Sequence, residues 1–356
     1  MYIESDPMQI QQRVPLAPLT TLRVGGPARY FAAAKSPEEV QQAVAFARCQ
    51  NLPVFVLGGG SNLVVSDRGF CGIVLRIAIA GIERATAASG PMCFEVGAGE
   101  CWDEFVAEAV RQNCAGIECL SGIPGSVGAT PVQNVGAYGQ EVSETIESVR
   151  ALDLRDGSIR EFGRAECRFG YRSSIFNTDA RGRFVILRVR FALTPDGAPR
   201  IVYADLKKHF AGLASLPSLS EVRAAVRQIR AAKGMLIQEG DPDARSVGSF
   251  FKNPVISSAQ HDVLVERAQS RGVMVPSYPA LESQRKISAA WLVENSGFQK
   301  GYVLGRAGIS SKHALAIVNR SDATAAEIIA LRNQIQAAVE KTWGIRLDPE
   351  PVFLGS

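Results

Sequence analysis

Apolar residues recur along this chain with two different periods, and each period predicts a different kind of element. A spacing of three or four residues, typical of one helix face, predicts helices at 36–49, 102–113, from 218 onward, 259–268, 287–295 and 324–344. Continuous or alternating apolar runs predict strands at 54–57, 73–77, 94–99, 146–154, 184–192 and 345–354. Ser36 and Ser218 each precede a glutamate by three residues at a helix start, which is the capping-box pattern, and Thr324 opens the last helix. Helices and strands are mixed along the whole chain, so an α+β fold is expected.

Composition and charge describe an ordinary soluble protein and argue against several classes. Hydrophobic residues make up 46% and charged residues 21% of the 356 positions, enough for two or three domains with an ample core. The net charge of +4 is small and scattered, without a Lys/Arg block, which argues against nucleic-acid binding. No apolar run reaches the roughly 18 residues that a membrane span needs.

Cysteine usage and the start of the chain predict a cytoplasmic protein. The seven cysteines form no CxxC pair, and no signal-peptide pattern opens the sequence. We therefore expect reduced thiols and no metal site. Cys114 and Cys119 could form a redox pair, but we expect both to be buried, inert thiols.

One stretch without any period interrupts the pattern. Residues 121–141, SGIPGSVGATPVQNVGAYGQE, contain five glycines and two prolines among 21 residues and no run of charge. Glycine lets a ligand approach bare backbone, where N–H groups can hold a phosphate. The amides of Gln133 and Asn134 suit a polar ring edge. A surface loop without a ligand is the alternative, but such loops are usually richer in charged residues, so we predict a binding loop.

A second glycine-rich segment, 57–63, reads LGGGSNL and lies between two predicted strands. This strand-loop-strand context makes it neither a Walker loop nor a GxGxxG dinucleotide fingerprint. Two loops of this kind predict one ligand with a pyrophosphate, held between two small α+β units.

The two loops also resemble a known family. LGGGSNLVVSD at 57–67 and the 121–141 loop resemble the flavin-binding half of UDP-N-acetylenolpyruvoylglucosamine reductases, the MurB family, whose FAD fold is of the vanillyl-alcohol-oxidase type. FGYR at 169–172, GSFFKNP at 248–254 and LDPE at 347–350 continue the match in the same order. The resemblance spans nearly the whole chain.

The resemblance implies an α+β fold in which two small subdomains clasp non-covalent FAD and a C-terminal α+β domain binds the substrate. It places the FAD-binding domain at 1–200, divided near 85, and the substrate domain at 201–356, with a tail strand at 345–356 that returns to the active site. The implied cofactor contacts are Gly58, Gly59, Gly60, Ser61, Asn62, Gly122, Ile123, Pro124, Gly125, Ser126, Gly128, Ala129, Asn134 and Gly136.

The implied reaction reduces UDP-N-acetylglucosamine enolpyruvate to UDP-N-acetylmuramate, with NADPH as hydride donor, in peptidoglycan precursor synthesis. It needs a hydride at one carbon and a proton at its neighbour. By the match to the family, Arg172 pairs with the developing oxyanion, Glu350 lies at the same group, and Ser249 donates the proton. The implied substrate contacts are Tyr171, Tyr203, Arg230, Lys233, Lys252 and Asn253.

Several of these residues also have ordinary structural interpretations. Tyr203 could be an exposed tyrosine, Arg230 part of a solvated basic helix face, and Arg172 a surface stack on aromatic rings. Ser249 alone would be interpreted as a turn serine, and only its GSFFKNP context makes it the predicted proton donor.

A serine hydroxyl is a poor acid in water, so Ser249 needs a supporting donor. Lys252 and Asn253 are close in sequence, and either could serve. His313 is another candidate, but it matches a position in a structural strand of the family and is left out. Val352 stands where some family members carry a basic residue, which puts one charge contact in doubt.

Two other functions stay open at this point. One is another FAD enzyme of the same fold, such as a sugar or alcohol oxidase, which would have no reason for the GSFFKNP motif. The other is a non-catalytic flavin or nucleotide-sugar binding module, which could lose Arg172, Ser249 or Glu350, yet all three are present. In either case small molecules are the expected partners, without nucleic acid or membrane, and a monomer is expected.

Overall fold

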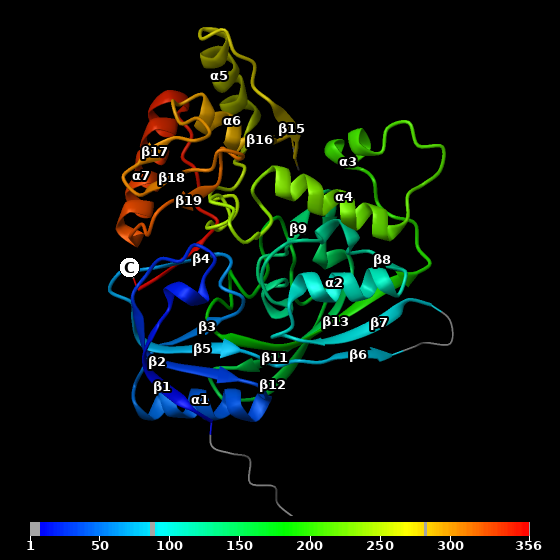
Figure 1. Cartoon of the computed structure of the whole chain (residues 1–356), viewed down its shortest axis with the longest axis vertical. Helices are drawn as coiled ribbons and strands as arrows, with labels where there is room; N and C mark the ends of the chain where they lie inside the picture. Colours follow the sequence, from blue (N-terminus) through cyan, green and yellow to red (C-terminus); the bar gives the residue numbers. More distant parts are fainter. Residues whose placement is uncertain (1–7, 86–89, 281–282, 356) are drawn as a thin grey trace, which may run out of the picture. The chain divides into compact units, whose positions relative to one another are not determined.

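The computed structural model describes residues 8–85, 90–280 and 283–355. The chain forms two compact units, each built from separate parts of the sequence (Figure 1). Unit 1 comprises Met1–Val14, Ala28–Gly60 and Phe70–Ala232, and unit 2 comprises Pro15–Pro27, Ser61–Gly69 and Lys233–Ser356. None of the helices in the described ranges combines the length and the hydropathy that a membrane crossing requires.

The first part of unit 1 is a four-stranded sheet with a helix against it (Figure 1). Its strand order is β1-β2-β5-β3, from Ile10–Pro15, Pro27–Ala34, Phe70–Ile77 and Val54–Leu57. Helix α1 (Pro37–Cys49) begins where the Ser36 hydroxyl accepts the N–H of Glu39. Its apolar face packs into the core with residues of β2 and β5, and consists of Val40, Ala43, Val44 and Ala47.

The second part of unit 1 is a larger antiparallel sheet in the order β12-β11-β13-β7-β6, with β8 paired to β13. Its strands are β6 (Ile82–Ala85), β7 (Met92–Gly97), β8 (Cys114–Ala115), β11 (Ile146–Asp153), β12 (Ile159–Gly163) and β13 (Phe184–Pro195). Helix α2 (Trp102–Arg111) packs on this sheet through aromatic rings. The centroid of Phe105 lies 5.0 Å from that of Phe191 and 5.7 Å from that of Phe94.

The remaining helices and strands complete unit 1. They are η2 (Glu118–Leu120), η3 (Val127–Ala129), β9 (Gly136–Ala137), β10 (Gln140–Glu141), η4 (Val142–Glu144), α3 (Ala204–His209) and α4 (Leu219–Ala232). The predicted capping box of α4 is present, because the Ser218 N–H donates to the Glu221 carboxylate and the Glu221 N–H donates to the Ser218 hydroxyl.

Unit 2 holds three small sheets in its described residues. Their orders are β14-β16-β15, β17-β18-β19 and β20-β4. The strands are β4 (Leu63–Val65), β14 (Val255–Ile256), β15 (Ser277–Pro279), β16 (Arg285–Ile287), β17 (Val303–Leu304), β18 (Ala307–Ile309), β19 (Ile317–Asn319) and β20 (Val352–Leu354). Strand β20 runs parallel to β4, which joins the end of the chain to the segment after the first glycine loop.

The helical elements of unit 2 are η1 (Ala17–Leu19), α5 (Ser258–Gln269), α6 (Ala289–Glu294) and α7 (Ala325–Trp343). Helix α7 begins after Thr324 as predicted, with a capping box formed by Thr324 and Glu327, and ends at Gly344, whose φ of 70° is a left-handed cap. Its buried stripe includes the predicted core residues Ile328, Leu331, Ile335 and Val339.

The predicted α+β class is confirmed, and the predicted elements are found with adjusted limits. The helix expected from 287 begins later, because Ile287 ends β16 and the Ser288 hydroxyl caps α6. The strand expected over 345–354 is limited to β20; before it, Pro349 forms only an isolated bridge with Phe251.

Candidate active site

The two predicted glycine loops lie against each other within unit 1. A Cβ atom on Gly59 would lie 2.5 Å from Cα of Gly125, and one on Gly58 would lie 2.7 Å from Oγ of Ser126. At Gly59 the neighbouring atoms are backbone, so a side chain cannot fit there without separating the loops, whereas at Gly58 the neighbour is the end of the Ser126 side chain. We call residues 58–60 and 122–126 together the cradle.

The cradle offers unused backbone donors. Among the described residues, no hydrogen bond uses the N–H of Gly59, Gly60, Gly125 or Ser126. Backbone N–H groups gathered on facing loops form a binding place for an anion such as a pyrophosphate. The donor chemistry of the cradle therefore fits the phosphates of a dinucleotide cofactor.

A charged cluster holds the start of the 121–141 loop. The Asp103 carboxylate on α2 accepts the Gly122 N–H at 2.6 Å. It also pairs with Arg223 at 2.6 and 3.0 Å and with Arg227, both on α4. Arg230, one helical turn further, donates its Nε–H to the Gly122 carbonyl at 3.1 Å. Two helices thus fix the position of one glycine of the cradle.

The charge of Asp103 is stabilised where it lies. Partial burial opposes ionisation, but hydrogen bonds from Arg223 and Gly122 and the charges of Arg223 and Arg227 outweigh burial and lower the pKa of Asp103 from 3.8. Because folding lowers the pKa of Asp103, its ionised carboxylate stabilises the folded protein at pH values above the ordinary carboxyl pKa. This stabilisation is lost as the pH falls through the lowered pKa.

We expect Asp103→Asn to reduce the free energy of unfolding by about 1–3 kcal/mol at neutral pH, because two arginines lose their charged partner. Thermal unfolding at a series of pH values measures this. The difference from the unmutated protein should shrink as the pH falls below 3.8. Asp179→Asn is the matched control, since Asp179 forms an exposed pair with Arg168. An equal effect of the two substitutions would contradict the assigned role.

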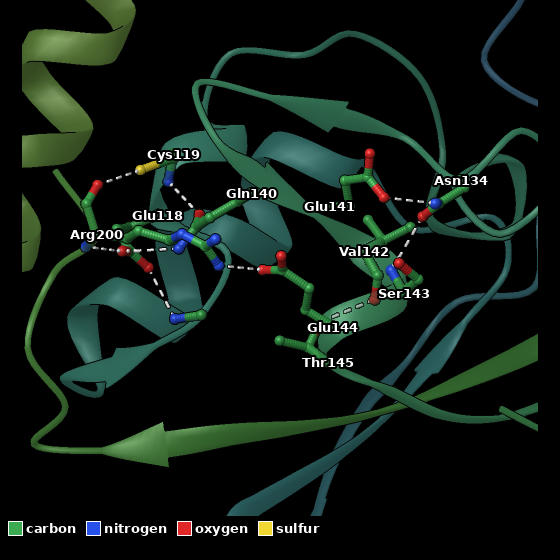
Figure 2. A network of polar contacts seen from close by, with 11 residues as sticks. Glu118, Cys119, Asn134, Gln140, Glu141, Val142, Ser143, Glu144, Thr145 and Arg200 are labelled. Atoms are coloured by element: carbon green, nitrogen blue, oxygen red, sulfur yellow. Dashed lines mark hydrogen bonds and ion pairs between the residues drawn. The ribbon is translucent and has the colours of Figure 1, made fainter. Parts of the chain in front are cut away.

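The end of the same loop is fixed by a buried carboxylate, Glu118 (Figure 2). It accepts hydrogen bonds from the N–H of Gly116 at 2.8 Å, the side-chain amide of Gln140 at 2.9 Å and the N–H of Arg200 at 2.9 Å. The side-chain amide oxygen of Gln140 in turn accepts the N–H of Cys119 at 2.8 Å. Because Glu118 precedes the loop and Gln140 ends it, this network joins the two ends of the loop.

Asn134, predicted to contact the cofactor, takes part in the loop's own structure (Figure 2). Its side-chain N–H₂ donates to Glu141 at 2.8 Å and to the Gly170 carbonyl at 3.0 Å, and its oxygen accepts the Ser143 N–H at 3.2 Å. These bonds shape the region in which Gly136 lies. Contact of Asn134 with the cofactor stays a prediction.

Arg172 lies beside the 121–141 loop in unit 1. Its guanidinium donates to the Gly136 carbonyl at 2.8 Å and lies over the Tyr171 ring at 5.8 Å from the centroid. The backbone of Arg172 has a φ of 52°, which is unusual for a residue with a side chain. This strained position holds a permanent positive charge next to the loop.

Tyr203 is exposed, and its ring packs edge-on against Tyr138 at a centroid distance of 5.3 Å. Tyr138 is buried and hydrogen-bonded to the buried Arg230. Burial lowers the pKa of Arg230, against the raising effects of Tyr138 and Asp103. A continuous set of contacts therefore runs from Tyr203 through Arg230 to Gly122 of the cradle.

In unit 2 the segment that contains Ser249 lies beside the segment that contains Glu350. The Glu350 N–H donates to the Phe250 carbonyl at 2.9 Å, and the Lys252 N–H donates to the Asp348 carbonyl at 3.0 Å. Asn62 joins this arrangement, since its amide donates to the Glu350 carbonyl at 3.2 Å. Segments far apart in sequence thus lie side by side in unit 2, and the catalytic roles of Ser249 and Glu350 stay predictions.

The neighbours of Ser249 in the GSFFKNP segment differ in their surroundings. The Asn253 side-chain oxygen accepts the Ala289 N–H at 2.9 Å, so it holds the start of α6. Gly248 has a φ of 74°, and this left-handed turn precedes Ser249. Lys252 is half-buried.

His313 lies beside Ser249, although it is not among the predicted site residues. The structure places His313 in the turn between β18 and β19 and not in a strand. Its Nε2 is 3.5 Å from the Ser249 hydroxyl, and its Nδ1 accepts the Leu315 N–H at 3.2 Å. Burial, helped by the charges of Lys233 and Lys300, lowers the pKa of His313 to about 4, so its imidazole is neutral at neutral pH.

The chain matches known proteins over nearly its whole length. It is 43% identical to the UDP-N-acetylenolpyruvoylglucosamine reductase of Thermobifida fusca, over 97% of this chain and 98% of that protein. It is 44% identical to that of Streptomyces coelicolor, over 98% and 91%. The chain belongs to the UDP-N-acetylenolpyruvoylglucosamine reductase family. This confirms the resemblance inferred from the loops and motifs.

Two domain families and one solved structure support this family assignment. Residues 28–163 match the family described as "FAD binding domain", and residues 241–354 match "UDP-N-acetylenolpyruvoylglucosamine reductase, C-terminal domain". The crystal structure of the reductase (MurB) from Thermus caldophilus aligns with a TM-score of 0.66 at 27% identity, covering 98% of this chain and 99% of that one. The "FAD binding domain" match includes the cradle, in agreement with its donor chemistry.

The reductase family's motifs did not reveal every residue of this region. Asp103 and Glu118 were missed, because a carboxylate in the first turn of a helix or before a loop is usually solvated. Cys119 is buried as expected, and burial raises the pKa of its thiol, which supports an inert thiol. His313 was considered but not predicted as a site residue, because it matches a structural strand position of the family, and its contact with Ser249 is visible only in the folded chain.

Proposed function

We propose that this chain reduces UDP-N-acetylglucosamine enolpyruvate to UDP-N-acetylmuramate with electrons from NADPH, in the synthesis of peptidoglycan precursors. The observation that carries this proposal is the match to a named reductase at 43% identity over nearly the full length of both proteins. It favours the reductase over an oxidase of the same fold and over a non-catalytic binding module. When bound, FAD would supply the hydride chemistry between NADPH and the substrate.

The protein's own contribution begins with holding the cofactor. The cradle's backbone donors would bind the pyrophosphate, and the predicted contacts at Ser61, Ile123, Pro124, Gly128 and Ala129 lie in or next to its two loops. Gly128 is tightly packed, because a Cβ there would lie 2.5 Å from that of Ala98. The Asp103 cluster and Arg230 hold Gly122, and the Glu118 network joins the two ends of the loop, so both hold the loop in position for the cofactor.

Three residues carry the proposed chemistry on the substrate. Arg172 offers a permanent positive charge to the oxyanion that develops on the enolpyruvyl carboxylate. Ser249 donates a proton to the carbon next to the one that accepts the hydride. Glu350 is proposed to share a proton at the same carboxyl group.

The remaining assignments concern the substrate and the organisation of the protein. We assign substrate contacts to Tyr171, Tyr203, Arg230, Lys233, Lys252 and Asn253. We assign FAD binding to residues 1–200, divided near 85, and substrate binding to residues 201–356, with the tail 345–356 in the active site. This functional division differs from the two units defined by contacts. A monomer in the cytoplasm is proposed, and light scattering of the purified protein tests the monomer.

The proposed function is tested by flavin absorbance in the absence of oxygen. NADPH should bleach the flavin band, and UDP-N-acetylglucosamine enolpyruvate should restore it. UDP-N-acetylglucosamine, which lacks the enolpyruvyl group, should not restore the colour. Fast recovery of colour in air without the sugar nucleotide would indicate an oxidase, and no bleaching by NADPH would contradict the reductase.

We expect Tyr203→Phe to raise the dissociation constant of the enolpyruvyl sugar nucleotide about threefold to tenfold, the effect of one lost hydrogen bond. The substitution keeps the ring that packs on Tyr138, so the fold should be retained. Flavin reduction by NADPH should stay nearly normal. Titration of the oxidised protein with the sugar nucleotide measures the change. Tyr278→Phe, at an exposed tyrosine of β15, is the control, and an unchanged affinity in Tyr203→Phe would make Tyr203 an ordinary surface residue.

A further inference from the structure

The hydrogen bonds of His313 determine which of its nitrogens carries a proton. A neutral imidazole has one N–H donor and one bare nitrogen acceptor. The Leu315 N–H points at Nδ1 from 3.2 Å, so Nδ1 is the bare acceptor. The proton of the neutral ring is therefore on Nε2, the atom 3.5 Å from the Ser249 hydroxyl oxygen.

This arrangement is opposite to that of a serine nucleophile with a histidine base. In a serine–histidine pair that activates a nucleophile, the bare nitrogen faces the hydroxyl and removes its proton. Here the protonated nitrogen faces the hydroxyl, so the imidazole donates and the Ser249 oxygen accepts. The hydroxyl proton of Ser249 is left to point elsewhere.

We propose that His313 is a positioning residue which makes Ser249 a proton donor by giving a hydrogen bond to its oxygen. The inference rests on the proposed reaction, in which Ser249 donates a proton to the substrate carbon. When the O–H bond of Ser249 breaks, its electron pair stays on the oxygen, and the proton forms the new C–H bond. The Nε2–H of His313 stabilises the alkoxide that remains, and water returns a proton to the oxygen afterwards.

The surroundings of the imidazole keep His313 as the donor and the Ser249 oxygen as the acceptor of this hydrogen bond. Protonation of Nδ1 would place two donors against each other, because the Leu315 N–H already points at it. The groups that act on the ring are burial and the positive charges of Lys233 and Lys300, and all three oppose a cationic imidazole. At neutral pH the His313 nitrogen that faces Ser249 is therefore a hydrogen-bond donor, and His313 cannot remove the hydroxyl proton of Ser249.

The first test reads the proton position directly in the unmutated protein. Heteronuclear NMR of the imidazole nitrogens distinguishes a protonated from a bare nitrogen, and His313→Gln identifies the signal. A neutral ring protonated on Nε2 at neutral pH is expected. A ring protonated on Nδ1, or a cationic ring at neutral pH, would overturn the proposal without bearing on the reductase activity.

The second test uses half-reactions of the full-length protein with FAD bound. His313→Ala should slow flavin re-oxidation by the enolpyruvyl sugar nucleotide about tenfold to a hundredfold, the effect of a lost hydrogen bond to a charged group. Flavin reduction by NADPH should stay near normal, which shows that the variant is folded. His313→Gln, which retains a side-chain N–H donor, should recover part of the rate. His261→Gln, in α5 of the same unit, is the control.

A double-mutant cycle separates this role from a structural one. In a Ser249→Ala background, His313→Ala should slow re-oxidation little further, because the oxygen that it supports is gone. Equal slowing in both backgrounds would overturn the proposal. If the unmutated protein is not re-oxidised by the sugar nucleotide at all, the proposed function itself fails, and that result is seen before any variant is compared.

Discussion

Ser249→Ala should bind FAD and be reduced by NADPH at close to the normal rate, and then fail to pass electrons on to the substrate. The reason is that hydride transfer must be accompanied by protonation of the neighbouring carbon, and the alanine side chain has no acidic proton. Positioned proton transfer typically contributes about 10²- to 10⁴-fold, so flavin re-oxidation should slow by about that factor. Stopped-flow absorbance of the flavin band in each half-reaction measures the two steps separately.

Two further variants make the Ser249 result interpretable. Ser249→Cys keeps a proton on a similar side chain and should retain more activity than the alanine variant. Ser296→Ala removes a hydroxyl that donates to the Leu292 carbonyl in α6 of the same unit, and it should re-oxidise normally. If Ser249→Ala is re-oxidised as fast as the unmutated protein, Ser249 is a turn residue and Glu350 becomes the next candidate for the proton donor.

Local chemistry explains why much of the fold could be predicted from sequence. Ser36, Ser218 and Thr324 start helices where they were expected, because an N-cap is made by residues within one turn of each other. The apolar face of α1 follows from spacing alone in the same way. The glycine loops were recognisable because close backbone approach excludes side chains, as Gly59 shows.

Contacts between distant segments could not be predicted from the same patterns. The segment around Thr21 belongs to unit 2 because its hydroxyl donates to the Ser246 carbonyl at 2.6 Å, across 225 residues. Asp67 joins the same unit by accepting the N–H groups of Ala325 and Ala326 at the start of α7. Neither contact leaves a periodic signal, since each depends on one polar side chain and a distant backbone group.

The same limit applies to the candidate site. Ser249 and Glu350 were predicted because each lies in a motif that resembles the family, and unit 2 places their segments side by side. Asp103 and His313 lie outside those motifs, and their partners are 19 and 64 residues away. Their roles follow from hydrogen-bond direction and burial, which only the folded chain provides.

Gly59→Val should give a folded protein that has lost most of its FAD. A Cβ at this position would lie 2.5 Å from Cα and 2.9 Å from the carbonyl carbon of Gly125, so valine must push the two loops of the cradle apart. Overpacking of this kind costs about 1–3 kcal/mol, which weakens FAD binding about tenfold to a hundredfold if the cost falls on the cradle. The flavin-to-protein absorbance ratio after purification, and fluorescence titration of the apoprotein with FAD, measure the loss.

The control for Gly59→Val is a valine at a glycine of the same unit that has room for it. A Cβ on Gly163 in β12 would make an ordinary contact, 3.5 Å from the Glu166 carboxylate, so Gly163→Val should keep its flavin. Gly125→Val tests the cradle in a second way, because a residue with a side chain is strained at the φ of 129° found at Gly125. Circular dichroism should show both cradle variants folded, since residues 58–60 and 122–126 lie outside the strands of unit 1. Full flavin content in folded Gly59→Val and Gly125→Val would contradict the placement of the pyrophosphate in the cradle and would require another binding place for FAD.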